Sequence, residues 1–305
     1  MDLSPTPSSR TTTKSRRAGH LVGESRNGDG GDQVRVKLLI AYDGAPFRGF
    51  AINEGVETVA GRLTEALTII VQGPVTLTCA GRTDAGVHAW GQVVTFDADA
   101  SRVVPDMLRS SVNSMCGPEI VCREAIVVES DFDARYHATG RSYRYTILNR
   151  PVPDPFLYDR AWLLTMPLDV DAMNKGGQHL LGLHDFSSFC RRQMVISPEG
   201  QDVEAPRLRR LRQVTWSRHE NDVVRLDIEA NSFCNQMVRS ITGCLVGVGL
   251  GELSPQDVPG ILALQDRNEA GRVAPPHGLT LWNVNYDGKR VHMPGARQGD
   301  VTEST

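Results

Sequence analysis

The sequence has none of the usual signals for a membrane segment, secretion or a bound metal. No apolar run is long enough to cross a membrane, and the chain starts without the apolar core of a signal peptide. Six cysteines form no Cys-x-x-Cys pair and no Cys/His cluster at zinc spacing. They are Cys79, Cys116, Cys122, Cys190, Cys234 and Cys244. We therefore expect a cytoplasmic protein without membrane contact or a metal site, and its cysteines as reduced, mostly buried thiols.

An excess of positive charge and a nucleotide-binding loop are also missing. The 33 Lys and Arg residues are outnumbered by 36 Asp and Glu residues, giving a net charge of −3. An RNA partner would therefore have to meet a local basic patch. No Walker A motif occurs. A glycine-rich run at residues 247–252 is like a dinucleotide loop, but Glu252 takes its third glycine position, and the run closes a predicted helix instead of opening one. We expect no organic cofactor.

Composition divides the chain into a folded centre and two tails. Residues 1–33 are rich in Ser, Thr, Arg, Gly and Asp, which predicts a disordered polar tail, and residues 288–305 form a second polar tail. Apolar residues make up 40% of the chain, enough for a sizeable core. We place the boundary between two α/β halves near residue 138, which gives residues 34–138 and 139–287.

Strand and helix patterns alternate through the first half. Apolar alternation predicts a strand at residues 34–42, helical spacing predicts a helix at residues 59–70, and Pro105 suits the first turn of another helix. A strand follows at residues 120–129. The order strand, helix, strand, strand, helix, strand is typical of an α+β fold with helices on one face of a sheet. The other face would be free to carry a substrate.

A glycine-rich loop at residues 80–89 is the most informative stretch. It lies between two apolar runs, residues 75–79 and 92–96, which read as strands. Its glycines mark an unusual backbone path that presents Arg82, Thr83 and Asp84 at the tip of a strand pair. By spacing alone, a hairpin connection with a solvated Asp is the more common outcome.

Arginines alternate with aromatic residues just beyond the proposed boundary. On a strand, Arg141, Tyr143 and Tyr145 share one face and Arg144 points to the other. An aromatic ring among arginines suits a flipped base and its phosphates. The alternative is a core tyrosine on a half-buried strand.

The second half carries two predicted helices and a basic run. Helical spacing predicts one helix that ends at Gly182 and a longer one at residues 233–248, with Arg239 off its apolar stripe. The basic run fits either a solvated strand or a phosphate-binding stripe, and on a strand Leu211 and Gln213 would share a face. It consists of Arg207, Arg209, Arg210, Arg212 and Arg218.

A His184-Asp185 pair stands beside serines and raises the alternative of a hydrolase. A catalytic triad is defined by its geometry, and adjacency in sequence is no evidence for one. No Gly-x-Ser-x-Gly elbow is present. We interpret this segment as packing.

Several segments, in order, resemble the TruA family of tRNA pseudouridine synthases between about residues 34 and 287. The strongest is Gly-Arg-Thr-Asp-Ala-Gly-Val-His at residues 81–88. The others are Tyr-Asp-Gly-x-x-Phe-x-Gly at 42–49, Phe-Asp-Ala-Arg with Arg-x-Tyr-x-Tyr at 132–145, His-Asp-Phe-Ser-Ser-Phe at 184–189, Phe-x-x-x-Met-Val-Arg-x-x-x-Gly at 233–243 and Ala-Pro-x-x-Gly-Leu-x-Leu at 274–281. The chain departs from the family pattern at Phe50, Ala51, Asn235 and Gln236.

The resemblance implies a fold and a reaction. The fold would have two α/β halves of ferredoxin-like (RRM-like) topology, joined through a mixed, mainly antiparallel sheet with helices on one face and an active-site cleft between the halves. The reaction would convert uridine to pseudouridine at positions 38, 39 and 40 of the tRNA anticodon stem-loop. The protein would be a homodimer in which one tRNA touches both subunits. No atoms enter or leave in this isomerisation, so it needs no cofactor.

The resemblance also assigns roles to residues. Asp84 would be the nucleophile, with Arg239 as the partner that keeps its carboxylate ionised in a dry pocket. Tyr143 would stack on the flipped uracil, Leu279 would line the site, and Arg82 would hold the flipped-out state. Thr83 would join these substrate-binding residues. Further tRNA contacts would come from Arg135, Arg141, Arg191 and Arg192.

Two other functions compete with this interpretation. One is a synthase of the same fold that acts on a different RNA. The other is a non-catalytic RNA-binding or RNA-folding protein that keeps the scaffold. The intact run from Arg82 to Asp84, together with Tyr143, argues against the second, since binding alone needs no buried carboxylate.

Overall fold

The first strand shows how the sheet buries one face. In β1 (Gln33–Tyr42), Val36, Leu38 and Ile40 are fully buried, whereas the residues between them are partly exposed. This alternation packs one face of the strand against α1 (Val59–Val71) and α2 (Pro105–Cys116). The computed structural model describes residues 32–192, 194–196, 201–204 and 207–287. The two predicted tails therefore lie almost entirely outside the described residues.

The remaining elements follow in chain order. The other strands are β2 (Thr78–Cys79), β3 (His88–Asp99), β4 (Ile120–Val128), β5 (Gly140–Leu148), β6 (Trp162–Leu163), β7 (Gly182–Asp185), β8 (Met194–Ile196), β9 (Asp202–Glu204), β10 (Leu208–Arg218), β11 (Val223–Ala230) and β12 (Leu279–Asn285). The other helices are α3 (Val170–Gln178), α4 (Met237–Gly249) and α5 (Asp257–Leu264). Within the described ranges, none of the helices is long and apolar enough to span a bilayer.

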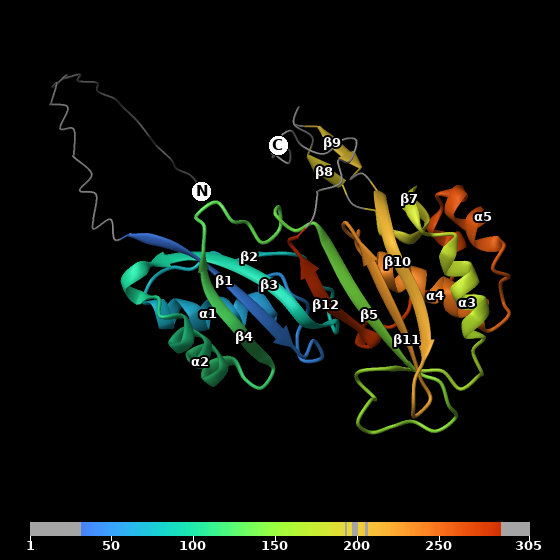
Figure 1. The fold of residues 1–305 in the computed structure, drawn as a ribbon, viewed down its shortest axis with the longest axis horizontal. Helices are drawn as coiled ribbons and strands as arrows, with labels where there is room; N and C mark the ends of the chain where they lie inside the picture. Colours follow the sequence, from blue (N-terminus) through green and yellow to red (C-terminus); the bar gives the residue numbers. More distant parts are fainter. Residues whose placement is uncertain (1–31, 193, 197–200, 205–206, 288–305) are drawn as a thin grey trace, which may run out of the picture. The chain divides into compact units, whose positions relative to one another are not determined.

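One mixed sheet runs through the described chain in the order β4-β1-β3-β12-β5-β11-β10-β7 (Figure 1). Its ladders are antiparallel, except that β12 pairs parallel with β3 and β6 pairs parallel with β5. The first half follows the predicted order of strand, helix, strand, strand, helix, strand. The α+β prediction with a mainly antiparallel sheet is confirmed.

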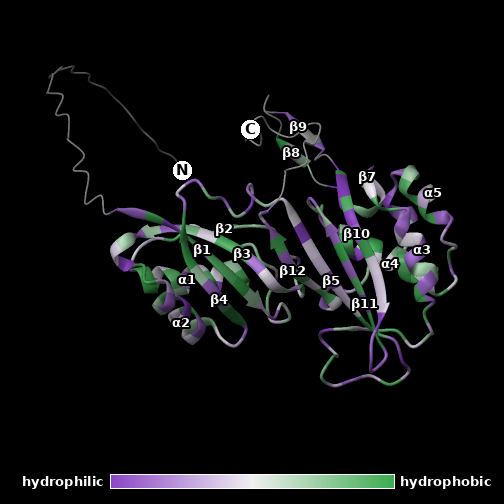
Figure 2. Ribbon diagram, viewed as in Figure 1, coloured by the Kyte–Doolittle hydropathy of each residue, from purple (hydrophilic) through white to green (hydrophobic). Residues whose placement is uncertain are grey.

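Two hydrophobic cores lie along this sheet. One packs α1 and α2 against β1, β3 and β4, and the other packs α3, α4 and α5 against β5, β10 and β11. Tyr143 of β5 is half-buried and touches both cores. In Figure 2 the strands β1 and β3 and the helix α4 are largely hydrophobic. Every residue of α4 except Arg239 is buried. The division at residue 138 stays a prediction.

Several predicted boundaries are wrong for identifiable reasons. α3 ends at Gln178, and the chain then turns through Leu180 and Leu181 into Gly182, whose φ of 102° opens β7 instead of closing the helix. The longer helix starts at Met237, so Phe233 lies in the loop before it. The strand expected at residues 75–79 shortens to Thr78–Cys79.

A β-bulge in β10 overturns the predicted face pattern of the basic run. The register with β11 shifts between Leu211 and Gln213. Leu211 is therefore buried and Gln213 is exposed, although strict alternation would place both side chains on one face.

The prediction that all cysteines are reduced is wrong for one pair. Cys190 and Cys234 form a disulfide, and their Cα atoms lie 5.7 Å apart, within the usual range for such a bond. The two cysteines are 44 residues apart, and no local pattern pairs them. The other four are free, and Cys244 is buried enough to raise its pKa to about 12.

Candidate active site

The loop that carries Asp84 is held from several sides. The Thr83 hydroxyl lies 2.7 Å from the Tyr42 hydroxyl, and the Thr83 carbonyl accepts from the Phe50 amide at 3.1 Å. Farther back, the Gln92 side chain donates to the Gly81 carbonyl at 2.7 Å. Thr83 is itself buried. These bonds fix the backbone on one side of Asp84, so Thr83 positions the loop.

Two glycines let other segments approach the loop closely. Gly49, with φ of 104°, sits so that a Cβ would press on the Thr83 carbonyl and the Asp84 backbone. Gly86, with φ of 75°, turns the chain directly after Asp84, and a Cβ there would meet Pro276 at 3.2 Å. The predicted unusual backbone path is therefore present.

His88 anchors the far side of the loop. Its Nδ1 accepts from the Gly44 amide at 3.0 Å, and its Nε2 lies 3.1 Å from the carbonyl oxygens of both Asp159 and His277. The same Nδ1 lies 3.1 Å from the Asp43 carboxylate. His88 thereby ties three distant segments to the start of β3.

Arg239 forms an ion pair with Asp84. Its NH1 lies 3.4 Å from Asp84 Oδ2, and its Nε donates to the Ala274 carbonyl at 2.7 Å. The Ala274 amide in turn donates to the Arg239 carbonyl at 3.1 Å. The Arg239 side chain is 14% exposed and that of Asp84 is 35% exposed. The predicted pair therefore exists, and the arginine side chain is the more enclosed of the two.

Tyr143 lies on β5, within electrostatic range of the Asp84 carboxylate. Burial raises the pKa of its hydroxyl to about 12, against a lowering by Arg141 and with a further raising by the charge of Asp84. Its ring meets Phe233 edge-on, with 5.1 Å between ring centroids. Tyr143 therefore presents a protonated hydroxyl near Asp84 at neutral pH.

The other predicted substrate-binding residues lie at different depths. Arg82 is exposed beside Asp84, with its guanidinium accessible. Leu279 is buried at the start of β12, in register with Tyr145, while Leu281 is the β12 residue in register with Tyr143. The structure thus pairs Asp84 with Arg239, and it places Tyr143 and Leu279 on the adjacent strands β5 and β12.

The four arginines predicted as tRNA contacts differ in their surroundings. Arg141 is half-buried and donates to four backbone carbonyls, including that of Ala80 at 2.8 Å, so it braces the base of the Asp84 loop. Arg135 is exposed over the Tyr136 ring, at 5.3 Å from the ring centroid. Arg191 and Arg192 are exposed, and Arg192 pairs with Glu204. Their contacts with tRNA stay a prediction.

The phosphate-stripe alternative for the basic run has weak support, because several of these arginines have internal partners. Arg207 pairs with Glu204, and Arg212 donates to the Thr139 carbonyl at 3.0 Å. Arg218 donates to the Leu168 carbonyl at 3.1 Å. These side chains hold the fold together.

The hydrolase alternative finds no catalytic geometry. The Asp185 carboxylate accepts from both the amide and the hydroxyl of Ser187, as in a local turn, and His184 Nε2 lies 2.8 Å from the Leu181 carbonyl. Neither contact links a histidine to a serine hydroxyl. Throughout the described ranges, no group of three or more His, Cys, Asp and Glu side chains could hold a metal ion.

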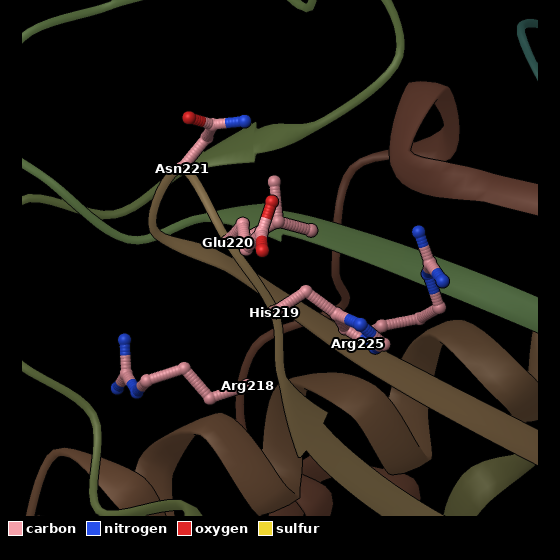
Figure 3. Close-up of a pocket in the computed structure, with 6 residues that line it drawn as sticks. Arg218, His219, Glu220, Asn221 and Arg225 are labelled. Atoms are coloured by element: carbon pink, nitrogen blue, oxygen red, sulfur yellow. The ribbon is translucent and has the colours of Figure 1, made fainter.

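A cavity of about 600 Å³ opens at the hairpin between β10 and β11 (Figure 3). The guanidinium groups of Arg218 and Arg225 point to opposite sides there, and His219 Nε2 lies 2.8 Å from the Ser217 hydroxyl. None of the predicted site residues lines this cavity. It adds nothing to the Asp84 site.

Sequence reasoning missed several residues of the site. Tyr42 and Gly49 belong to the Tyr-Asp-Gly segment, whose resemblance marked the region without a role for either side chain. Phe233 was assigned to a helix, and its contact with Tyr143 depends on the loop that the disulfide holds. No local pattern could have paired residues so far apart in the chain.

Comparison with known proteins supplies the family. Residues 177–287 match the family model described as tRNA pseudouridine synthase. The tRNA pseudouridine synthase A of Bacillus velezensis is 37% identical over 256 residues, covering 83% of this chain and 100% of that protein. That of Bacillus subtilis is 35% identical with the same coverage, and that of Halalkalibacterium halodurans is 39% identical over 82% of this chain and 92% of that protein. This chain belongs to the tRNA pseudouridine synthase A family.

Proposed function

We propose that this protein isomerises uridine to pseudouridine at positions 38, 39 and 40 of the tRNA anticodon stem-loop, with Asp84 as the nucleophile. The observation that carries the proposal is the ion pair between Asp84, on its glycine-rich loop, and Arg239 of α4, in a member of this family.

The chemistry requires an ionised carboxylate and a uracil that can rotate in the site. The bond between uracil N1 and ribose C1′ breaks, the uracil rotates, and C5 forms the new bond to C1′. The hydrogen on C5 leaves as a proton, and N1 gains one. Attack of Asp84 on C1′ or on C6 of the uracil needs the same charged carboxylate. Burial disfavours that charge, and the Arg239 guanidinium offsets the cost.

The neighbouring side chains suit the handling of a flipped base. The half-buried Tyr143 ring offers a stacking face, which returns about 1–3 kcal/mol against the few kcal/mol that flipping costs. Its hydroxyl, within electrostatic range of Asp84, would orient the uracil. The exposed Arg82 can occupy the space the base vacates or contact the backbone. Leu279 and Phe233 supply apolar walls that exclude water.

We further infer a cytoplasmic homodimer in which one tRNA touches both subunits. The support is the family resemblance, since the chain matches its relatives over nearly their whole length. Sedimentation of the full chain with and without tRNA tests this part: a dimer that binds tRNA supports it, and a monomer at micromolar concentration contradicts it.

The test of activity is tritium release from tRNA that carries 5-tritiated uridine. The C5 hydrogen is lost only when C5 takes the sugar, so release reports the chemistry directly. We expect release by the wild type and none by Asp84→Ala. Release at other sites, mapped chemically, would indicate a synthase with a different RNA target. Binding without release by the wild type would indicate an RNA-binding protein.

A further inference from the structure

Arg267 is a second arginine beside the active site that none of the sequence motifs assigned. It begins the 3-10 helix Arg267–Ala270, between α5 and β12. Its NH2 donates to the Gln236 side-chain oxygen. Its NH1 is buried and has no hydrogen-bond partner among the described residues. A guanidinium that only joined two loops would be expected to bond through both terminal nitrogens, since a buried unpaired donor is costly.

Gln236 holds Arg267 from an unusual backbone position. It is the residue before α4, and its φ of 62° places it in the left-handed region that non-glycine residues rarely occupy. Strain of this kind tends to collect at functional sites. Gln236 is also one of the positions where this chain departs from the family pattern.

The segments that carry these residues are joined to one another. The Arg191 amide donates to the Asn235 carbonyl at 2.9 Å, directly beside Gln236. The disulfide joins Cys190 to Cys234, the residues that directly precede Arg191 and Asn235 in the chain. Arg191, Gln236 and Arg239 therefore sit on a common frame at the start of α4.

Arg267 lies within electrostatic range of Arg191, Arg239 and Asp84, of which Arg239 and Asp84 form the ion pair. Burial lowers the pKa of Arg267, the positive charges of Arg191 and Arg239 lower it further, and the Asp84 carboxylate raises it. Together, the three guanidinium groups and the Asp84 carboxylate carry a net charge of +2 when all four are ionised. Mutual repulsion makes this arrangement unfavourable by itself, and an anion that enters the space relieves it.

The anion that the proposed function brings to this place is an RNA phosphate. The reacting ribose has a phosphate on each side, and a planar guanidinium matches phosphate geometry through paired N–H donors. We propose that Arg267, oriented by Gln236, binds a backbone phosphate of the target nucleotide beside Asp84. This inference rests on the proposed function and adds a residue that binds the RNA backbone next to the reacting nucleotide.

The experiment measures tRNA binding by the full chain at several salt concentrations, together with kcat and KM from tritium release. Each phosphate contact contributes about 0.7–0.9 to the slope of log affinity against log salt. For Arg267→Gln we expect this slope to fall by about that amount. We also expect KM to rise about ten- to a hundredfold, with a smaller change in kcat.

Two variants and one control sharpen the result. Arg267→Lys should keep the salt slope and lose part of the affinity, because a single ammonium keeps the charge without the fork. Gln236→Asn should weaken binding less than Arg267→Gln, since asparagine tolerates the left-handed backbone but cannot reach Arg267. Arg272→Gln is the control: it removes a nearby cation that is already paired with Glu252 and should leave the slope unchanged.

An unchanged salt slope and KM in Arg267→Gln would overturn the inference. So would an equal loss of slope in Arg267→Lys and Arg267→Gln, because a role in folding alone does not depend on charge. If the wild type binds tRNA but releases no tritium, the proposed function fails. The binding slopes then still decide whether Arg267 contacts a phosphate.

Discussion

Gly243 in α4 packs directly against the carbonyl oxygen of Arg272, so closely that a Cβ on residue 243 would overlap it. Gly243 lies one helical turn after Arg239, so this contact holds residues 272–274 against α4 near Arg239. Both bonds between Arg239 and Ala274 depend on that approach. A glycine without any polar atom therefore sets the position of the guanidinium that faces Asp84.

Gly243→Ala should lower both stability and turnover. The added methyl group must push the residue 272–274 segment away from α4, which costs about 1–3 kcal/mol and displaces Arg239. Urea unfolding and tritium release measure the two effects. Gly247→Ala in the same helix is the matched control, because its Cβ would meet side-chain atoms alone, the nearest being Leu253 Cδ1 at 3.4 Å and Glu252 Oε2 at 3.6 Å. Equal behaviour of the two variants would contradict the role of Gly243.

Arg239→Ala should remove most activity without unfolding the protein. The variant loses the charge that offsets burial of the Asp84 carboxylate, an effect of about 10²–10³ in kcat by analogy with other electrostatic groups in active sites. Arg239→Lys should recover part of it, since the charge stays but the bond to the Ala274 carbonyl is lost. Tritium release and thermal melting are the measurements. Near-normal turnover in Arg239→Ala would exclude this role.

Tyr143→Phe should retain tRNA binding and slow the chemical step. The ring and its contact with Phe233 remain, while the hydroxyl near Asp84 is removed. Because burial raises the pKa of Tyr143 to about 12, this hydroxyl keeps its proton throughout the neutral range. Binding by filter retention and single-turnover rates separate the two steps. Unchanged rates would show that the hydroxyl takes no part.

His277 should make the stability depend on pH. Burial lowers its pKa below the usual 6.5, against a raising by its hydrogen bond to the Ala161 backbone. The unfolded chain then binds a proton at a higher pH than the folded protein. The free energy of unfolding should therefore fall as the pH drops through 6.5 toward the folded pKa, and level off below it. Urea unfolding on either side of pH 6.5 should show a smaller fall in His277→Gln than in the wild type. An identical fall would rule this contribution out.

Local patterns predicted the elements whose form depends only on the residues of their own segment. The alternation of β1 and the apolar spacing of α1 indicated their elements to within one residue, because each buries a single face. The predicted C-terminal end of α3 and the predicted start of α4 were wrong, since both depend on partners elsewhere. Phe233 continues the helical spacing of α4, yet it lies in a loop against Tyr143 of β5. The bulge after Leu211 is likewise a property of the pairing with β11.

The site residues that lie in segments resembling the family could be predicted from the sequence. The loop around Asp84 and the pairing with Arg239 came from resemblance, since 155 residues separate the two and no periodicity relates them. Arg267 has no such motif. Its place beside the site results from the packing of a short 3-10 helix against the residue before α4, which sequence spacing does not encode.

The position of β12 governs when the sheet can form on a nascent chain. The strand lies between β3 and β5, with Leu281 in register with Ala89 on one side and with Tyr143 on the other. Both neighbours leave the ribosome long before it does, and each keeps an open edge until it arrives. Joining the strand that follows Asp84 to the strand that carries Tyr143 therefore waits until β12 has been synthesised, whatever order the earlier helices take.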